Sequence, residues 1–476
     1  MPTSGSFVQS WAKAQQSQAH SSKNAPVFYR NLEAELDTLR QNQRCLGLHN
    51  YTGLGKDMID FASADMLGLG SSGKMRSAFM EELVKSPDWW VSASGPRLTF
   101  GNSKYMEDLE HDIALFHGAE TALMAVNGGM ANGAIFTAIP RPGDALVYDE
   151  FIHASVHDGM KNSLALCKKS FRHNSVDSFR ETLETVRNSQ PLIHNGARCV
   201  IIAVEGIYSM DGDVCPLQEL VNTAKEIFPS GNAQFVIDEA HSHGVIGPKG
   251  AGLVSALGLE KEIAIRMHTL PKAMGAGGAV IMCNNTVRNM LLNFGRNILF
   301  SGAPGFPLLA AIRVGYDFLK SGQTQQAQDR IKYMAELFKQ KMTAHPVWET
   351  ANDAKILRVP LWDQDEQEQR FWTPICPILT RPNTKHNVFL AFHLQLNGFI
   401  AYPVYFPVVP KSAERVRIIF HASNTDEQIE ALATSVCCWA EEMLEIDEEG
   451  AEGERLPTAA RQAYAILMKE GLNASA

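Results

Sequence analysis

The chain has 476 residues, of which 45% are hydrophobic and 20% are charged, the composition of an ordinary soluble globular protein. A chain of this length exceeds what one simple hydrophobic core supports, so two domains are the first expectation. The formal net charge of −9 argues against non-specific binding of nucleic acid, because that activity needs a basic surface.

The cysteines and the N-terminus bear on the cellular compartment. Eight cysteines are scattered without CxxC spacing, which predicts reduced thiols inside a cell rather than a disulfide framework or a metal site. No apolar run approaches the roughly 18 residues of a membrane helix, and no secretory signal is recognisable. The first 32 residues contain no Asp or Glu and only three basic residues. This favours a disordered or helical arm in a cytoplasmic protein over a mitochondrial presequence.

Residues 1–58 are expected to form this N-terminal arm, with a helix near Phe28–Leu46 and a turn at 51–55. Residues 59–323 alternate strand-like apolar runs with helical runs and are expected to form a large domain. The strands expected there are Thr121–Ala125, Ala145–Asp149, Cys199–Val204, Phe235–Asp238 and Ala279–Cys283. The helices expected there are Glu107–Leu115, one that opens after Asn127, and Pro216–Phe228.

Residues 324–476 have the pattern of a smaller, more charged domain. The helices expected in it are Thr324–Met342, Asp426–Leu444 and Thr458–Glu470, and the strands are Ile375–Leu379 and Val416–Phe420. A charged loop over Asp363–Arg370 and an acidic run over Glu441–Glu454 are expected to be solvated. We therefore predict a small C-terminal domain with an acidic and helical tail.

A pair of glycines, Gly128 and Gly129, lies where the first expected strand of the large domain turns into a helix. Glycines at such a turn expose backbone N–H groups, and a helix N-terminus favours an anion. Two glycines alone are more typical of a tight turn that binds nothing. Because the turn precedes an Asp and a Lys of special interest, we interpret Gly128, Gly129 and Met130 as part of a phosphate site.

The Asp and the Lys are the two groups that carry the chemistry. Asp238 ends an apolar run, and His241 follows three positions later. Lys272 lies in the glycine-rich segment Met267–Gly278 with almost no polar neighbours, so burial is expected to lower the pKa of its amine. A strand-end Asp and a loop Lys are what pyridoxal phosphate (PLP) requires: the lysine forms a Schiff base, and the carboxylate keeps the ring nitrogen protonated. A lysine on a tight loop is the alternative for Lys272 taken alone.

The motifs around these residues resemble those of the α-oxoamine synthases, a family of fold-type I PLP enzymes. Asp238–Gly244 matches Asp-Glu-Ala-His-Ser-x-Gly, and Thr269–Gly275 matches Thr-Leu-x-Lys-Ala-x-Gly. The similarity runs from about Asp60 to Gln428 in the family's order. The family includes 8-amino-7-oxononanoate synthase, 2-amino-3-ketobutyrate ligase, 5-aminolevulinate synthase and serine palmitoyltransferase. The resemblance implies an α/β fold, with a mostly parallel seven-stranded sheet in the large domain and a smaller α+β C-terminal domain.

The resemblance also implies which residues bind PLP and act in catalysis. The implied catalytic residues are Lys272, His153, Asp238 and His241. In the family, the residue matched by His153 stacks on the pyridine ring, and the one matched by Ser209 hydrogen-bonds the ring hydroxyl. The implied cofactor-binding residues are Gly128, Gly129, Met130, His153, Ser209, Asp238, His241, Thr269, Lys272 and Ser301.

Two arginines are candidates for binding the substrate. Arg417 matches the second arginine of the family's Arg-x-Arg motif, which binds the substrate carboxylate. Arg97 lies in a segment that matches Gly-x-Arg-Leu-x-x-Gly-Asn, and a structural salt bridge is an equal alternative for it. Ser301 lies in a segment that reaches the neighbouring subunit's phosphate in homodimeric relatives, although the family's Thr is Gly302 here. A homodimer with the active site at the subunit interface is therefore implied.

Two positions expected near the substrate depart from the family's pattern. Ala64 replaces an asparagine that helps hold the substrate carboxylate in relatives, and Met106 falls where a histidine is usual. The cofactor side is intact by comparison. Asp211 and Asp213 are expected to fix a turn rather than bind a metal ion, because they lack further ligands. The departures favour an unusual amino acid or acyl group.

The implied reaction is a decarboxylative Claisen-type condensation of an α-amino acid with an acyl thioester, giving an α-aminoketone. The thioester is one of CoA or a carrier protein, and the departures favour specialised, polyketide-linked metabolism. The alternatives are 8-amino-7-oxononanoate synthase of biotin synthesis and another fold-type I activity, such as an aminotransferase or a retro-aldol lyase. A catalytically dead partner subunit is disfavoured because Lys272, Asp238 and His153 are all present.

Overall fold

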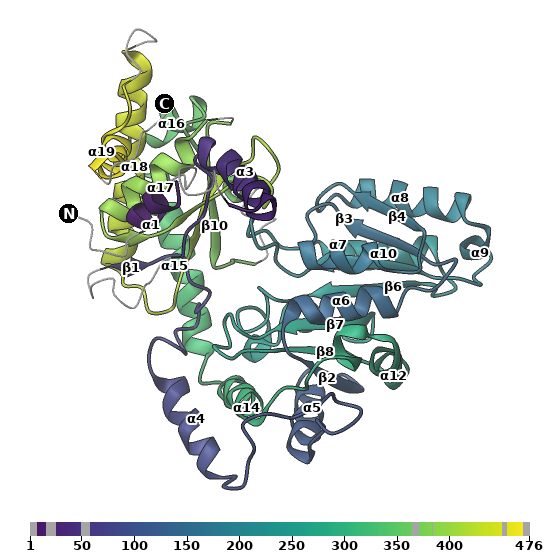
Figure 1. Cartoon of the computed structure of the whole chain (residues 1–476). Coiled ribbons are helices and arrows are strands. Elements are labelled where there is room, and N and C mark those ends of the chain that lie inside the picture. Colours follow the sequence, from purple (N-terminus) through teal and green to yellow (C-terminus); the bar gives the residue numbers. More distant parts are fainter. Residues whose placement is uncertain are drawn as a thin grey trace.

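The structure, a computed structural model, describes residues 7–15, 25–48, 58–363, 371–382, 384–449 and 455–469. Two lobes are built on separate sheets, one in the large domain and one in the small domain (Figure 1). The turn expected at 51–55, most of the loop expected after Asp363 and the end of the acidic run lie outside the described residues.

The large domain is organised around a seven-stranded sheet in the order β2-β8-β7-β6-β5-β3-β4. Its strands are β2 (Thr121–Ala125), β3 (Ala145–Asp149), β4 (Cys167–Phe171), β5 (Val200–Glu205), β6 (Ala233–Asp238), β7 (Ile263–Thr269) and β8 (Ala279–Cys283). Neighbouring strands run parallel except where β8 pairs with β2 and β7. The predicted seven-stranded, mostly parallel sheet is confirmed.

Both faces of this sheet are buried, as is typical of parallel sheets covered by helices. Along β5, Ile202 and Val204 enter one hydrophobic cluster, while Ile201 and Ala203 enter the opposite one. The helices on the second of these faces are α6 (Gly128–Ala138), α7 (Ala154–Lys161), α12 (Asn285–Phe294) and α13 (Arg296–Leu299). The other face is covered by α4 (Lys74–Val84), α5 (Lys104–Phe116), α8 (Val176–Ser189), α9 (Pro191–His194), α10 (Leu217–Ile227), α11 (Leu253–Leu257) and α14 (Phe306–Lys320).

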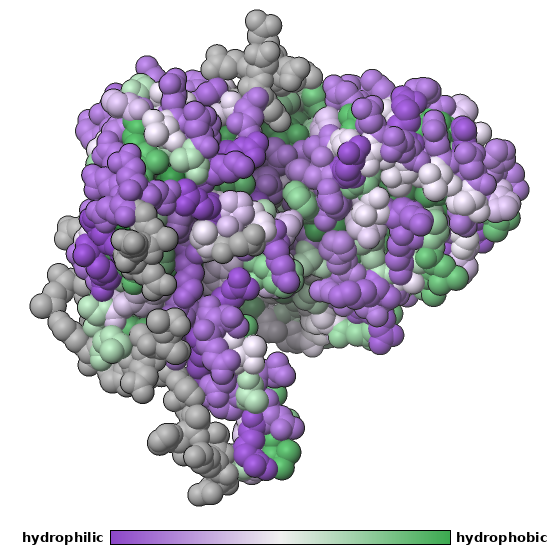
Figure 2. All heavy atoms as spheres, turned by 90° about the horizontal axis from the view of Figure 1, so that it is seen from above, coloured by the Kyte–Doolittle hydropathy of each residue, from purple (hydrophilic) through white to green (hydrophobic). Residues whose placement is uncertain are grey.

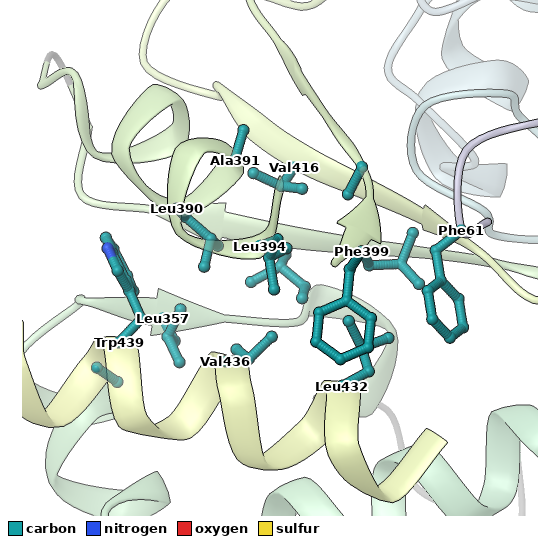
Figure 3. Packing of buried hydrophobic residues seen from close by; sticks show 14 of the residues in the cluster. Phe61, Leu357, Leu390, Ala391, Leu394, Phe399, Val416, Leu432, Val436 and Trp439 are labelled. Atoms are coloured by element: carbon teal, nitrogen blue, oxygen red, sulfur yellow. The ribbon is translucent and has the colours of Figure 1, made fainter. Parts of the chain in front are cut away.

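The small domain is built on a four-stranded antiparallel sheet in the order β12-β13-β10-β9. Its strands are β9 (Leu357–Arg358), β10 (Ile375–Thr380), β12 (Tyr402–Val404) and β13 (Arg415–Ile419). Its helices are α15 (Gln325–Thr343), α16 (Trp348–Asp353), α17 (His386–Leu396), α18 (Asp426–Glu448) and α19 (Thr458–Lys469). Figure 3 shows Leu432, Val436 and Trp439 pointing from α18 into a core shared with Leu390 and Leu394 of α17.

The N-terminal arm packs on the small domain. Helix α1 (Phe7–Ala14) buries Phe7 and Trp11 in the small-domain core, with the Trp11 ring 4.9 Å from that of Phe392. The helix expected near Phe28–Leu46 is α3 (Val27–Gln41), whose apolar side chains are exposed. Strand β1 (Ile59–Asp60) then pairs in parallel with β11 (Phe399–Ile400). The arm is thus continuous with the small lobe.

Helix α15 connects the two lobes. Ile331 of this helix packs in a large-domain cluster, whereas Met334 and Phe338 pack in the small-domain core. We propose that the domain boundary lies at the turn between α14, which ends at Lys320, and the start of α15.

The surface carries mainly polar side chains. The face in Figure 2 is mostly hydrophilic, with hydrophobic side chains in small patches. Large apolar side chains that are exposed include Trp90, Phe100 and Phe300. Within the described ranges, no helix combines the length and the apolar character needed to span a membrane.

Candidate active site

A cavity of about 250 Å³ lies where β5, β6 and β7 end and α6 begins. It is lined by Asn127, Gly128, Gly129, Asn132, His153, Ser155, Glu205, Ser209, Asp238, Ala240, His241, Met267, Thr269 and Lys272. Most of the predicted cofactor-binding residues therefore meet in one place, while Met130, Ser301, Arg97 and Arg417 do not line the cavity. A larger cavity of about 650 Å³ contains none of the predicted residues, so we place the chemistry in the smaller one.

Asp238 is held in a fixed orientation at the end of β6. One carboxylate oxygen, Oδ2, accepts a hydrogen bond from Asn132 Nδ2 at 2.9 Å, and Oδ1 accepts one from the Ala240 N–H at 2.9 Å. Asn132 Nδ2 also donates to Ser155 Oγ at 3.0 Å. The side chain is almost fully buried, so these bonds direct its negative charge into the cavity region.

Lys272 has the desolvated amine that its neighbours in sequence predicted. Burial lowers the pKa of this amine to about 8, although the nearby carboxyl groups of Asp238 and Glu205 raise it. Its Nζ lies 2.8 Å from His241 Nε2. Burial, followed by the positive charges of Lys272 and Arg417, holds the pKa of His241 well below its usual range. His241 is therefore neutral at pH 7 and accepts a hydrogen bond from the lysine.

Glu205 and Asn132 are site residues that the sequence interpretation missed. Glu205 ends β5 directly beside Asp238 in the register of the sheet. It is 3% exposed, and burial, followed by the charge of Asp238, raises the pKa of its carboxyl group well above the usual range. The available signal was a lone carboxylate at the end of a fully apolar strand, which is the same pattern that singled out Asp238.

The N-terminus of α6 has the form expected of an anion site. The side chain of Asn127 caps the helix by accepting a hydrogen bond from the Met130 N–H at 2.8 Å. A Cβ atom on Gly128 would lie 2.7 Å from Thr269 Oγ1, so only glycine allows this close approach to β7. Since the Met130 and Ala131 N–H groups bond Asn127, the donors left at this end, within the part of the chain that the structure describes, are those of Gly128 and Gly129.

His153 begins α7 at the edge of the cavity. Its Nδ1 accepts a hydrogen bond from the Ser155 N–H at 3.2 Å and lies 2.8 Å from Ser155 Oγ. The side chain is otherwise exposed, so the ring is oriented on one edge while its face is free for stacking.

The segment around Ser209 is tied to the small domain by two arginines of β13. Arg417 Nη1 donates to the Ser209 carbonyl oxygen at 3.0 Å, and the buried Arg415 forms an ion pair with Asp211. Arg417 lies outside the cavity lining, but its charge is close enough to lower the pKa values of Lys272 and His241. The small domain thus places one positive charge near a cavity that the large domain lines.

Asp213 takes part in fixing this segment, as expected. His173 lies between Asp213 Oδ2, at 2.7 Å, and Asp149 Oδ1, at 2.8 Å. Burial acts to lower the pKa of His173, but hydrogen bonds to these two carboxylates raise it to about 10. The imidazolium therefore links the ends of β3 and the Ser209 segment.

Arg97 is engaged in a buried ion pair. Its two terminal nitrogens donate to Glu110 at 2.6 and 2.8 Å, and its Nε donates to Asn102 Oδ1 at 2.6 Å. Both charged side chains are about 6% exposed or less. These contacts match the structural alternative for Arg97, and they occupy the groups that a substrate carboxylate would need.

Replacing Arg97 with leucine is expected to lower the free energy of unfolding by about 3 kcal/mol, the lower end of the loss for a broken buried ion pair, because buried Glu110 then keeps only its longer ion pair with Arg288 at 3.4 Å. Chemical denaturation measures this loss. Lys104→Ala, which breaks an exposed ion pair in the same region with Asp108, is the control and should change stability little. A variant Arg97→Lys with normal stability but a strongly raised KM for the amino acid would instead indicate a substrate contact.

Met106 and Ser301 differ from their expected surroundings. Met106 is fully buried in the large-domain core beside Met66, so it does not contact the cavity, and the expectation that it lies on the substrate side is not met. The Ser301 hydroxyl donates to the Asn297 carbonyl oxygen and is outside the cavity of its own chain. Ala64, the other departure, is half-buried.

Comparison with known proteins decides the family. A sequence model described as aminotransferase class I and II matches residues 56–436. The chain belongs to the aminotransferase class I and II family. Within this family, it is 46% identical over 457 residues to "aminoacyl transferase sphA" of Aspergillus fumigatus, covering 96% of each chain. It is 36% identical over 410 residues to an 8-amino-7-oxononanoate synthase of Emericella nidulans, covering 86% of this chain and 95% of the relative.

The fold agrees with that of a solved enzyme structure. A serine palmitoyltransferase from S. paucimobilis, solved with bound PLP, superposes with a TM-score of 0.67 at 22% identity. The superposition covers 82% of this chain and 88% of the other. The expected family and fold-type I architecture are therefore confirmed.

The residues of the site fit PLP, the cofactor expected from the sequence. Among the described residues, His241 Nδ1 and Glu205 Oε1 are buried polar atoms without a hydrogen-bond partner, so the cavity has polar groups left for a ligand. Gly128 and Gly129 leave backbone donors at the start of α6 for a phosphate. Lys272 presents an amine of lowered pKa, and Asp238 presents a fixed carboxylate.

Proposed function

We propose that this chain is a PLP-dependent α-oxoamine synthase that condenses an α-amino acid with an acyl thioester, releasing CO2 and a thiol. One observation carries the proposal. A chain similar over nearly its full length to an aminoacyl transferase has a lysine of lowered pKa that contacts His241 and is near enough to Asp238 for that carboxylate to act on its pKa. The 8-amino-7-oxononanoate synthase and serine palmitoyltransferase relatives agree with a PLP-dependent acyltransferase, as predicted from the sequence.

The cofactor would be held by the residues of the cavity. Gly128 and Gly129 would bind its phosphate, and Asp238 its ring nitrogen, with Asn132 fixing the carboxylate. His153 would cover the ring, and Ser209 and Thr269 would contact its edge. When bound, PLP supplies an electron sink that makes the α-proton of an amino acid acidic.

Three side chains would act on the substrates. Lys272 is suited to remove and return the α-proton, because at pH 8 about half of its amine is unprotonated. Neutral His241 accepts a hydrogen bond from this amine and so keeps it directed into the site. Arg417 would bind the amino-acid carboxylate, because its charge is close enough to lower the pKa of Lys272 and its bond to the Ser209 carbonyl uses Nη1 alone.

Specialised metabolism is the more specific part of the proposal. The similarity to the aminoacyl transferase covers 96% of this chain, whereas the similarity to the 8-amino-7-oxononanoate synthase covers 86% at lower identity. Ala64 also stands where relatives have an asparagine that helps hold the substrate carboxylate, so that contact is missing or supplied by another group. We therefore favour an unusual acyl chain on CoA or a carrier protein, with 8-amino-7-oxononanoate synthesis as the second candidate.

A homodimer with the site at the subunit interface is part of the same proposal. The Arg97 and Ser301 segments are joined by a bridge between Pro96 and Gly302, and aromatic side chains beside it are exposed. Phe100 is 62% and Phe300 is 67% exposed. Large aromatic residues are enriched at protein interfaces, so these positions suit contact with a second copy that places Ser301 near its phosphate.

The cytoplasm is the compartment that we propose. All eight cysteines are free, and five of them are buried. A reducing environment keeps such thiols unpaired.

Capture of PLP by the apoenzyme is expected to accelerate with pH up to about 8 and then to level off. Only the unprotonated amine is nucleophilic, and burial lowers the pKa of Lys272 from 10.5 to about 8. The rate constant should therefore rise about tenfold per pH unit below this value. Stopped-flow absorbance after mixing apoenzyme with PLP measures it, with an N-acetyl-lysine amide as the solvated control. A midpoint as high as that of the control would contradict a desolvated lysine.

Replacing Arg417 with glutamine is expected to raise KM for the amino acid by about 10- to 100-fold, the loss of one charge-assisted contact. The KM for the thioester should change little. Steady-state kinetics with each substrate varied in turn measures both values. The KM of Arg417→Lys for the amino acid should be intermediate, because lysine keeps the positive charge but not the paired donors of a guanidinium. An equal rise in both KM values would argue against a role in binding the carboxylate.

The experiment that tests the proposed function is a titration of purified protein followed by visible absorbance. Glycine, alanine and serine are added separately, and thioesters of pimelic acid and of longer or modified acids are then supplied on CoA and on carrier protein. A yellow protein whose band shifts with one amino acid, and which turns over a longer chain best, supports the proposal. High activity with alanine and pimeloyl thioester alone supports 8-amino-7-oxononanoate synthesis. A colourless protein after PLP addition would instead indicate a catalytically dead subunit.

A further inference from the structure

Three histidines without a role in the proposed reaction meet inside the large domain. His117 follows the last residue of α5, His243 lies in the turn after β6, and His268 lies in β7. None is more than 1% exposed, and one possible ligand nitrogen from each lies within 4.8 Å of the others. The ring centroids are 4.2 to 5.4 Å apart.

Two of these rings have a side-chain partner at one nitrogen. His268 Nε2 lies 2.9 Å from Glu239 Oε2, and His117 Nε2 lies 3.2 Å from the Tyr316 hydroxyl. A carboxylate only accepts, so Glu239 fixes the proton of His268 on Nε2 and leaves Nδ1 with a free lone pair. Ligating histidines of metal sites are oriented by outer carboxylates and other polar groups in this way.

The remaining nitrogens of the cluster are without partners. Among the residues that the structure describes, His117 Nδ1, His268 Nδ1 and both nitrogens of His243 make no hydrogen bond of good geometry. Burial lowers the pKa of His117, although the Ala251 backbone lies close enough to its ring to raise that pKa. Buried polar atoms of native proteins are nearly always bonded, because an unpaired one loses its hydration without compensation. Four unpaired nitrogens in one cluster are explained if a bound group accepts lone pairs from several of them at once. A metal cation is such a group.

We propose that His117, His243 and His268 bind a divalent transition-metal ion of the zinc class. Imidazole nitrogen suits such ions, and three histidines with a water molecule in the fourth position form a known tetrahedral zinc set. At a Zn–N distance of about 2.1 Å, tetrahedral geometry brings the nitrogens to about 3.4 Å from one another, so binding draws the three rings together.

The site is closed to solvent, so the ion stabilises the structure. Through its three histidine ligands, the ion links the end of α5 to the turn that follows His241 and to β7, the strand that leads to Lys272. No metal-ligand spacing is visible in the sequence, because the three histidines come from separate segments.

The test measures the metal content of untagged holoenzyme after incubation with zinc or cobalt and removal of the excess. The result expected is roughly one tightly held ion per chain, with a visible cobalt spectrum of imidazole ligands. His243→Leu should lose this ion. His111→Ala, at an exposed histidine, should keep it, and Lys272→Ala should also keep it, which separates the site from chelation by PLP. Equal metal content in wild type and His243→Leu would overturn the proposal.

Thermal stability gives a second readout that needs no variant. A strong chelator should lower the Tm of the wild type by about 5 °C or more, and added zinc should restore it. If the cluster were only three neutral imidazoles, the chelator would have no effect. His243→Leu would then keep or raise the Tm, because it removes two unpaired buried nitrogens. That pair of results would also overturn the proposal.

Discussion

Replacing Lys272 with alanine is expected to lower kcat/KM for α-aminoketone formation by about 10⁴-fold or more. The amine attaches the protein to its cofactor and moves the α-proton, so its loss removes two functions at once. Its lowered pKa and its contact with His241 suit it to both. The measurement is product formation at saturating PLP and both substrates, together with the visible spectrum of the dialysed variant.

Two controls separate this role from a general effect of the substitution. Lys272→Arg keeps a positive charge but should be as inactive as the alanine variant, because a guanidinium stays protonated. Lys249→Ala, at an exposed lysine, should retain full activity. Retention of more than about a tenth of the wild-type rate by Lys272→Ala would contradict the assignment, given the size expected of a lost general base.

Replacing Asp238 with asparagine is expected to lower kcat by about 10²- to 10³-fold, in the range of a lost electrostatic contact to developing charge. The reason is that only a carboxylate keeps a pyridine-type nitrogen protonated. Steady-state kinetics measures the loss of kcat. An unchanged Tm shows that the variant is as stably folded as the wild type.

The contact between Asp238 and Asn132 offers a matched control. Asparagine at position 238 can keep its bond to the Ala240 N–H, but its amide group opposes the amide of Asn132. The exchanged double variant, with Asp238→Asn and Asn132→Asp, restores a donor and an acceptor while moving the charge to α6. It should recover stability and remain inactive. If the double variant recovered activity, catalysis would depend on the hydrogen bond between positions 132 and 238 and not on a carboxylate at position 238.

Much of the large domain was predictable because its strands are short, apolar and bounded by polar residues. The strands β2, β3 and β8 have the predicted bounds. Strand β4 was not predicted because it carries two lysines and a serine at the sheet edge, and β7 was not because Arg266 and His268 interrupt its apolar pattern. Both strands form because neighbouring strands satisfy their backbone groups, which no local pattern reveals.

The candidate site was predictable where a motif names a residue, and less so where the fold brings residues together. Eight of the ten predicted cofactor-binding residues line one cavity, and Met130 and Ser301 are the exceptions. Glu205 and Asn132 join the site through the register of β5 with β6 and through the face of α6. Met106 was expected near the substrate but lies in the large-domain core, because α5 packs with this side chain facing inward. Such placements depend on contacts between segments far apart in the sequence.

The most direct test of the proposed chemistry is the balance of products from an amino acid labelled at its carboxyl carbon. The measurement follows labelled CO2, free thiol and α-aminoketone in the same reaction with the preferred thioester. A decarboxylative condensation predicts that the three appear together in equal amounts, and that none appears with Lys272→Ala. Formation of a keto acid from the amino acid, without release of CO2 or thiol, would show an aminotransferase and contradict the proposed function.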